Sequence, residues 1–335
     1  MIRRITKTLA RRASMLALTL SFFACGGDAK TDEATSGAPR PRPKPQAVVP
    51  SPPRSGGSAG ASQSVRPEAN ANRRVAQPML WEVSGPSGTS YLFGTIHMGI
   101  GPSDLPDSVR EKITETTTFI SEVDMTDPQL GPGMLKEAML PAGRSLEKDL
   151  GPDLWAKATA ATGGAMPSDR LAQFDPWFVL VTITSRFFEK AQQMDPVLHD
   201  QAKREGDRLA YLETWQEQVR YLEESLDLQV LKDALGDLDA QKRIAEGMQR
   251  SYLTGDAAEL ERFVFDAEDM KLHPKSYEVL FYKRNERWLP VLERHLKEGK
   301  AFVAVGAGHL VGERGLVAEL AKKGLTVTRY QPRSP

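Results

Sequence analysis

The pattern Gly-x-x-His occurs twice in this chain, each time directly after a short apolar run. The first copy, residues 94–97, follows Tyr-Leu-Phe, and the second, residues 306–309, follows Ala-Phe-Val-Ala-Val. β-Branched and aromatic residues that give way to glycine are typical of a buried strand at its end. We therefore expect His97 and His309 at strand ends, where an imidazole is held rigidly and can face a cleft.

The first 24 residues resemble an export signal, in which a basic segment without acidic residues precedes an apolar run at 15–24. A run of about ten residues is too short to cross a bilayer. Cys25, the only cysteine, follows Ala24, as in a bacterial lipobox that is cleaved before a lipidated cysteine. Phe22 and Phe23 depart from the usual residues there, which leaves ordinary signal cleavage open. In both cases we expect export to the bacterial cell envelope.

Lipidation of Cys25 would anchor the chain to a membrane, and Gly26 in place of an acidic residue favours the outer membrane, facing the periplasm. Residues 25–78 are rich in Pro, Gly and Ser and contain no aromatic residue, so we expect a disordered tether. Residues 79–335 are then one folded domain. They carry 31 basic and 40 acidic residues, a balance of −9, which argues against a nucleic-acid partner.

Within this domain, hydrophobic patterns and turn residues predict strands separated by helices. The expected strands are 80–83 and 89–93, paired as a hairpin, then 118–124, 208–213, 301–305 and 325–330. The expected helices are 103–117, 146–161, 173–193, 197–205, 217–252, 257–266, 276–298 and one after residue 312. This order predicts an α/β to α+β fold, with a mixed central sheet wrapped by helices and a helical lobe between the two His-bearing halves.

Four side chains with catalytic potential fall at the carboxyl ends of predicted strands: His97, His309, Glu122 and Glu213. Ligands collect beyond the carboxyl ends of neighbouring parallel strands. Two imidazoles and a carboxylate suit a divalent ion such as Mn²⁺, Co²⁺ or Zn²⁺, which would activate a water for hydrolysis. The spacing alone is a weak metal signal, because it lacks the close His pair of a His-Glu-x-x-His helix.

Residues 91–99 and 302–312 resemble the opening and closing motifs of the TraB/GumN family, which is related to the TIKI metalloproteases. Between them, residues 122–124, 211–214 with Gln218, and 284–285 with Trp288 follow the family's order. The resemblance covers about 80–330. It implies the fold shared with TIKI and erythromycin-esterase-like proteins, and a metal-dependent hydrolytic site. By position, the metal ligands and catalytic residues are His97, His309 and Glu122.

Other residues are candidates for supporting roles. Arg284 could bind a substrate carboxylate or stabilise an oxyanion, or form a structural ion pair. Asp124 is a candidate second ligand or a support for an imidazole, and Glu213 serves either the site or the cap of the next helix. The remaining candidates around the site are Asn285, Gly94, Gly306 and Gly308, the last of which we expect at positive φ.

The other three histidines, His199, His273 and His295, are expected to be solvated, and Trp288 to be a packing residue. Three functions then stay open. The first is a membrane-tethered, metal-dependent and peptidase-like hydrolase of a peptide or small molecule. The second is a non-catalytic envelope protein that binds a peptide, small ligand or haem in the same cleft. The third is metal-free hydrolysis with a histidine as general base.

Overall fold

The computed structural model describes residues 73–189 and 191–332. The predicted signal segment, Cys25 and most of the predicted tether lie outside these described residues. The described chain forms one six-stranded sheet in the order β4-β3-β5-β2-β1-β6. Its strands are β1 (Leu80–Gly85), β2 (Gly88–Thr95), β3 (Thr118–Ser121), β4 (Arg208–Tyr211), β5 (Ala301–Gly306) and β6 (Val327–Arg329).

The centre of the sheet is parallel and one side is antiparallel. Strand β5 lies between β2 and β3, parallel to both, and β4 continues the parallel part beyond β3. The hairpin partner β1 and the C-terminal β6 are antiparallel. This arrangement places the first and second Gly-x-x-His segments side by side, because Gly94 and Thr95 pair with Val305 and Gly306. The predicted mixed sheet is confirmed.

Helices make up most of the rest of the described chain. The helices before β4 are η1 (Pro102–Asp104), α1 (Asp107–Thr114), α2 (Leu130–Glu137), α3 (Leu146–Leu150), α4 (Pro152–Ala161), α5 (Ser168–Leu171), α6 (Pro176–Ser185) and α7 (Met194–Glu205). Those between β4 and β5 are α8 (Trp215–Ser225), α9 (Leu228–Gly236), α10 (Leu238–Thr254), α11 (Ala257–Val264), α12 (Ala267–Leu272), α13 (Pro274–Tyr277), the π-helical turn η2 (Glu278–Tyr282) and α14 (Lys283–Glu298). After β5 come η3 (Ala307–His309) and α15 (Leu316–Lys322).

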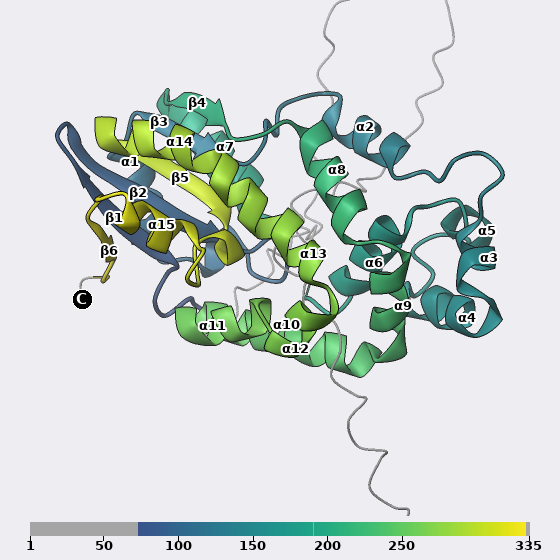
Figure 1. The fold of residues 1–335 in the computed structure, drawn as a ribbon. Helices are drawn as coiled ribbons and strands as arrows, with labels where there is room; N and C mark the ends of the chain where they lie inside the picture. The colour runs from purple at the N-terminus through teal and green to yellow at the C-terminus, as the bar shows by residue number, and fades with distance from the viewer. Residues whose placement is uncertain (1–72, 190, 333–335) are drawn as a thin grey trace, which may run out of the picture.

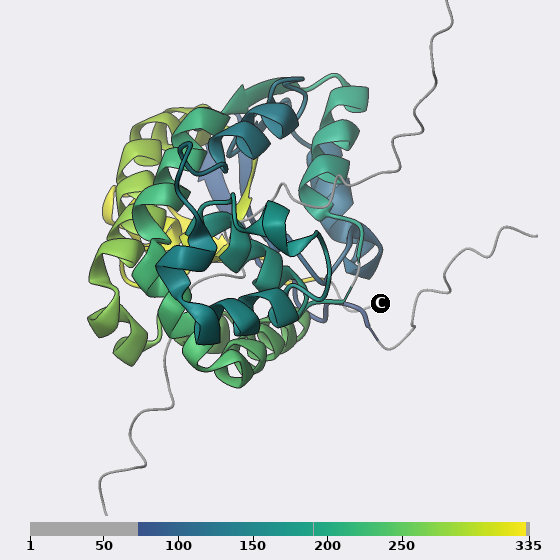
Figure 2. The ribbon, with the colours of Figure 1, turned by 90° about the vertical axis from the view of Figure 1, so that its right-hand side faces the viewer.

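The helices cover both faces of the sheet and extend beyond one of its edges. Helices α14 and α15 lie over one face, and α7 lies on the opposite face (Figures 1 and 2). Helices α2–α6, α8 and α9 form a lobe beside the point where β5 ends, as Figure 1 shows. The predicted helical lobe between the two His-bearing halves is therefore confirmed, and it lies next to the carboxyl ends of the parallel strands.

Several predicted elements are shorter than the sequence pattern suggested. The helix expected over 146–161 is two helices, because Gly151 has φ of 76° and Pro152 begins α4. The helix expected over 217–252 is three, with Asp227 and Asp237 as new N-caps. Asp227 and Asp237 start new helices because their carboxylates accept from backbone N–H groups of the first turn, and Pro152 suits a helix start because the N–H that it lacks has no partner there.

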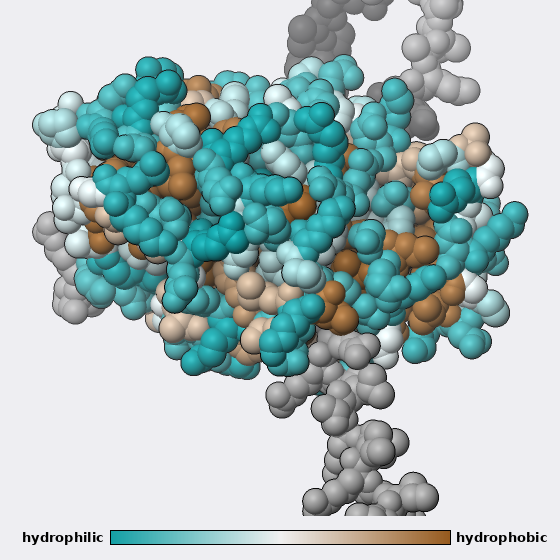
Figure 3. All heavy atoms as spheres, in the orientation of Figure 1, coloured by the Kyte–Doolittle hydropathy of each residue, from teal (hydrophilic) through white to brown (hydrophobic). Residues whose placement is uncertain are grey.

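The hydrophobic core continues from the sheet into the lobe, and it includes Val75, which is 2% exposed. The last residues of the predicted tether thus pack on the domain, where the N–H groups of Val75 and Ala76 donate to the carbonyls of Asp104 and Leu253. The face in Figure 3 is mostly hydrophilic, with hydrophobic residues in small patches. No helix of the described residues is both long and apolar enough to span a bilayer.

A substitution at Gly94 tests how closely the two Gly-x-x-His segments approach each other. A Cβ at Gly94 would lie 2.9 Å from both the Cα and the Cβ of Ala307. We expect Gly94→Val to lower the free energy of unfolding by about 1–3 kcal/mol, since overpacking a rigid core forces backbone shifts. Urea denaturation measures the change. The control is Gly131→Ala in α2, where a Cβ meets nothing within 4 Å; a similar loss in both variants would contradict this account.

Candidate functional site

The carboxyl ends of the four parallel strands each contribute one titratable side chain to the same edge of the sheet. Along the sheet order, Glu213 follows β4, Glu122 follows β3, His309 follows β5 and His97 follows β2. All four are buried, with 0–6% of each residue exposed. Residues that are 212 positions apart in the chain thus meet in one row, because β2 and β5 are neighbours.

Arg284, near the start of α14, joins three members of this row. Its Nη2 donates to Glu122 Oε2 and to Glu213 Oε1, both at 2.7 Å. Its Nε donates to Glu213 Oε2 at 3.1 Å. Its Nη1 donates to His309 Nε2 at 3.0 Å and to the carbonyl of Leu280 at 3.1 Å. These contacts use all the N–H donors of a guanidinium.

The Leu280 carbonyl belongs to the π-helical turn η2, just before α14. A π-turn inside a helix is frequent at functional sites, because it changes the direction of the side chains and carbonyls around it. Here the turn directs a main-chain acceptor at Nη1 of Arg284. The local backbone therefore helps to fix the guanidinium.

His309 is held as a neutral imidazole of one tautomer. Its Nε2 accepts from Arg284, so Nδ1 carries the hydrogen and donates to Asn285 Oδ1 at 2.7 Å. Burial, with the positive charge of Arg284, lowers the pKa of His309 well below its ordinary value. Asn285 is itself fixed, because its Nδ2 donates to the carbonyls of His309 and Arg314 at 3.2 and 3.0 Å.

The two glutamates are held by different sets of donors. Glu122 Oε1 accepts from the N–H of Gly306 at 2.8 Å, and Oε2 accepts from Gln218 Nε2 at 3.1 Å as well as from Arg284. Burial alone would raise the pKa of Glu122, but Arg284, His309 and His97 lower it below its ordinary value. Burial raises the pKa of Glu213, even though Arg284 opposes this shift. Neighbouring carboxyls with opposite shifts are typical of acid–base sites.

His97 has its own carboxylate partner. Its Nδ1 lies 2.9 Å from Asp195 Oδ2, and the other oxygen of Asp195 accepts from the hydroxyl of Thr95 at 2.7 Å. Burial alone would lower the pKa of His97, but the charge and hydrogen bond of Asp195 raise it above its ordinary value. A base whose ring is oriented by a buried carboxylate is a recurring catalytic pair.

The predicted ligand set does not fit a metal ion in this arrangement. Glu122 uses both oxygens, and His309 both nitrogens, in hydrogen bonds to the protein. Within 73–189 and 191–332, no group of three His, Cys, Asp or Glu side chains is arranged to hold a metal ion. The guanidinium of Arg284 lies where a cation bound by Glu122 and His309 would lie.

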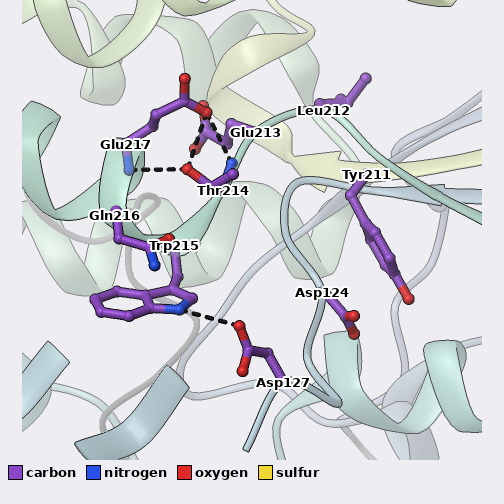
Figure 4. Close-up of a pocket in the computed structure, with 9 residues that line it drawn as sticks. All are labelled: Asp124, Asp127, Tyr211, Leu212, Glu213, Thr214, Trp215, Gln216 and Glu217. Carbon is purple, nitrogen blue, oxygen red and sulfur yellow. Dashed lines mark hydrogen bonds between the residues drawn. The ribbon is translucent and has the colours of Figure 1, made fainter. Parts of the chain in front are cut away.

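A cavity of about 510 Å³ adjoins the row at Glu213 and is shown in Figure 4. It is lined by Asp124, Asp127, Tyr211, Leu212, Glu213, Thr214, Trp215, Gln216 and Glu217. Asp124 lies here rather than beside a site histidine, and its Oδ1 accepts from the N–H and hydroxyl of Thr126 at 2.8 and 2.7 Å. Although burial opposes the shift, these hydrogen bonds and one from Tyr211 lower the pKa of Asp124.

Some local predictions differ from the structure. His199, His273 and His295 are not solvated, since they are 1%, 7% and 9% exposed; each lies on the inner side of its helix or at a helix end. Gly308 is not among the described glycines with positive φ, because it lies in the 3₁₀ turn η3, which needs negative φ. Trp288 packs in the core and also donates from Nε1 to Glu213 Oε2 at 3.2 Å.

One residue that completes the site, Asp195, was not singled out from the sequence. Asp195 stands before Pro196 at a helix start, where a carboxylate is ordinary, so the sequence carries no sign that it meets His97. Gln218, which the family resemblance includes, lies on the buried side of α8 and donates to Glu122. For Glu213, the structure places the carboxyl in the row, while Thr214 and Glu217 form the capping box of α8.

The fold and the row define an α/β protein with buried histidines and carboxylates at the carboxyl edge of its parallel strands. The chain belongs to the TraB/PrgY/gumN family, whose sequence model matches residues 79–329, which confirms the resemblance of the two end motifs.

Three curated proteins are similar to this chain. A "Metalloprotease TIKI homolog" of Amphimedon queenslandica is 25% identical over 77% of this chain and 62% of its own length. "Metalloprotease TIKI2" of Danio rerio is 24% identical over 76% of this chain and 61% of its own length. An "Uncharacterized protein" of Treponema pallidum (strain Nichols) is 24% identical over 74% of this chain and 81% of its own length. The match therefore spans under two thirds of the two named metalloproteases. No solved structure matches the chain.

The pairing of His97 with Asp195 makes a direct prediction. In Asp195→Asn the negative charge that favours the imidazolium is lost, so we expect the pKa of His97 to fall. An NMR titration of the imidazole C–H signals measures it. The control is Asp200→Asn on the same helix, an exposed carboxylate near His199, which should leave His97 unchanged. A pKa of His97 that stays the same in Asp195→Asn would contradict the pairing.

Proposed function

We propose that this chain is a peptidase-like hydrolase that cleaves an amide or ester bond at the strand-end row. One observation carries the proposal: four strand ends and α14 bring a carboxylate-oriented histidine, two glutamates and an arginine to one buried edge of the sheet. The relatives named metalloproteases support a hydrolytic reaction at low identity. Burying several charged side chains carries a large desolvation penalty, so such clusters are found preferentially at functional sites.

In the proposed reaction His97 is the general base. Asp195 holds Nδ1, and the imidazole takes the proton of the attacking water while the water oxygen bonds to the substrate carbonyl carbon. The tetrahedral intermediate then expels the amine or alkoxide, which takes this proton from His97 as the carbon–nitrogen or carbon–oxygen bond breaks. The base is thereby restored. Asp195 keeps the imidazole oriented and stabilises its charged form during both steps.

The glutamates and Arg284 have a positioning role in this proposal. Every N–H of Arg284 already has an acceptor, so its charge acts on the site through the carboxylates it holds. Glu122 fixes the main chain of β5 at Gly306, next to His309. The cavity beside Glu213 is our candidate for binding part of the substrate, at the opposite end of the row from His97, and its volume of about 510 Å³ is in the range of small-ligand pockets.

The names of the relatives point to a metal, whereas the side chains of this chain, as arranged, do not form its ligand set. We therefore route no step of the reaction through a metal ion. Residues His97, His309 and Glu122 remain the metal ligands that the family resemblance predicts. Metal content and sensitivity to a chelator separate the two forms of the hypothesis.

The enzymatic proposal is tested with a peptide and ester library and the full chain. We expect cleavage by the wild type, and a rate about 10²–10⁴-fold lower in His97→Ala, the range that a positioned general base contributes. His295→Ala is the control, because His295 is also buried but lies at the far end of α14. Equal rates for His97→Ala and the wild type would refute the role of His97. A ligand recovered unaltered after long incubation would favour the alternative, a binding protein.

We also propose that the chain acts in the bacterial cell envelope, anchored through lipidated Cys25, with a peptide or small molecule as its substrate. The support is the sequence alone, since residue 25 lies outside the described residues. We expect the wild type to incorporate a labelled fatty acid and to fractionate with membranes, and Cys25→Ala to do neither. Labelling of the Cys25→Ala variant would disprove lipidation at this residue.

A further inference from the structure

The positive charge between Glu122, Glu213 and His309 belongs to a side chain of the protein itself, Arg284. Five acceptors converge on one buried guanidinium, and four of them belong to side chains that follow strands: one oxygen of Glu122, two of Glu213 and Nε2 of His309. The fifth acceptor is the carbonyl of Leu280. We infer that Arg284 is the resident cation of this site, and that its guanidinium and a divalent metal ion exclude one another there.

The acceptors are the atoms that a metal would use. One imidazole nitrogen and two carboxylates form an ordinary donor set for Zn²⁺ or Mn²⁺. Two of them also have a second hydrogen-bond partner, Glu122 in Gly306 and His309 in Asn285, as the ligands of metal ions commonly do. The cage formed by Glu122, Glu213 and His309 therefore has the donor types of a metal site, but its atoms are arranged around the guanidinium of Arg284 and not for a metal ion.

The surroundings favour a planar organic cation. The guanidinium carbon lies 4.7 Å from the centre of the Trp288 ring and 5.8 Å from that of Tyr221. Aromatic faces attract a guanidinium, which is weakly hydrated and can stack. Arg284 is 1% exposed, so the cage offers little water to complete the shell of a small dication. Geometry and solvation both match the arginine.

The occupation by Arg284 is also required electrostatically. Glu122 and Glu213 are only 3% and 6% exposed, so their carboxylates need a compensating charge. Arg284 supplies it through an ion pair of 2.7 Å to each. Leaving such carboxylates without a partner is strongly unfavourable. A chain without Arg284 must then recruit another cation or protonate, whereas a chain with Arg284 has no reason to bind one in the cage.

The experiment compares metal binding in the full chain and two matched variants. Arg284→Met removes the charge and keeps the length of the side chain. Arg287→Met does the same three residues later on α14, at a half-exposed residue that pairs with Glu217 outside the row. All proteins are purified with Zn²⁺ or Mn²⁺ present and passed through gel filtration, and the bound metal is measured by elemental mass spectrometry.

We expect the wild type and Arg287→Met to retain no stoichiometric metal, and Arg284→Met to retain roughly one ion per chain. Adding Glu122→Gln or His309→Ala to Arg284→Met should abolish this binding. Stoichiometric metal in the wild type that Glu122→Gln removes would overturn the inference. An Arg284→Met chain that binds no metal when metal is supplied, whether or not it folds, would overturn it equally. Hydrolysis is not measured, so failure here is distinct from failure of the proposed reaction.

Discussion

The structure depends on compensating two glutamates that are buried at the carboxyl edge of the sheet. Arg284 does so by spanning Glu213, Glu122 and His309, and it thereby connects the ends of β4, β3 and β5 to α14. The geometry of the edge is fixed as a consequence. Charges in a low-dielectric interior are tolerated only with good partners, so removing any one member leaves the others uncompensated. Arg284, Glu122, Glu213 and His309 therefore behave as one unit in which the positions of the side chains depend on each other.

The second half of the row, His97 with Asp195 and Thr95, is built in a different manner. It connects β2 to α7 on the opposite face of the sheet from α14. The edge thus receives one charged partner from each covering layer, Arg284 from one side and Asp195 from the other. The pKa of His97 is raised and that of His309 is lowered. Two histidines from the same short motif consequently have opposite protonation tendencies, which their partners set.

Much of the fold could be predicted from the sequence, because buried strands and turn glycines have recognisable local sequence patterns. The order of strands and helices, the hairpin, and the lobe between the two motif halves followed from apolar runs and turn residues. Strand and helix ends were less accessible. Strands β3 and β4 end at Ser121 and Tyr211, two or three residues before the predicted ends, because the glutamates that follow turn into the row instead of continuing the ladder.

Site residues could be predicted from the sequence only where the neighbouring residues form a recognisable pattern. The motif histidines, Glu122 and Arg284 were found through position and family resemblance. Asp195 was not, since its contact with His97 spans 98 residues and nothing in the chain near either residue reports it. The engagement of Arg284 by all its neighbours was equally invisible, because saturation of a donor set is a property of three-dimensional packing.

The pairing of β2 with β5 has a consequence for the way the protein forms. The sheet's central contact joins segments from opposite ends of the domain, and β5 separates β2 from β3 although it is made some 200 residues later. Contacts of such long range slow folding, because a large loop must close before they form. Without residues 301–309 the sheet lacks the strand between β2 and β3. Arg284 then lacks His309, and Glu122 lacks the N–H of Gly306. The row at the carboxyl edge is thus completed only by the last strand of the parallel part of the sheet, which lies between two strands from the first half of the domain.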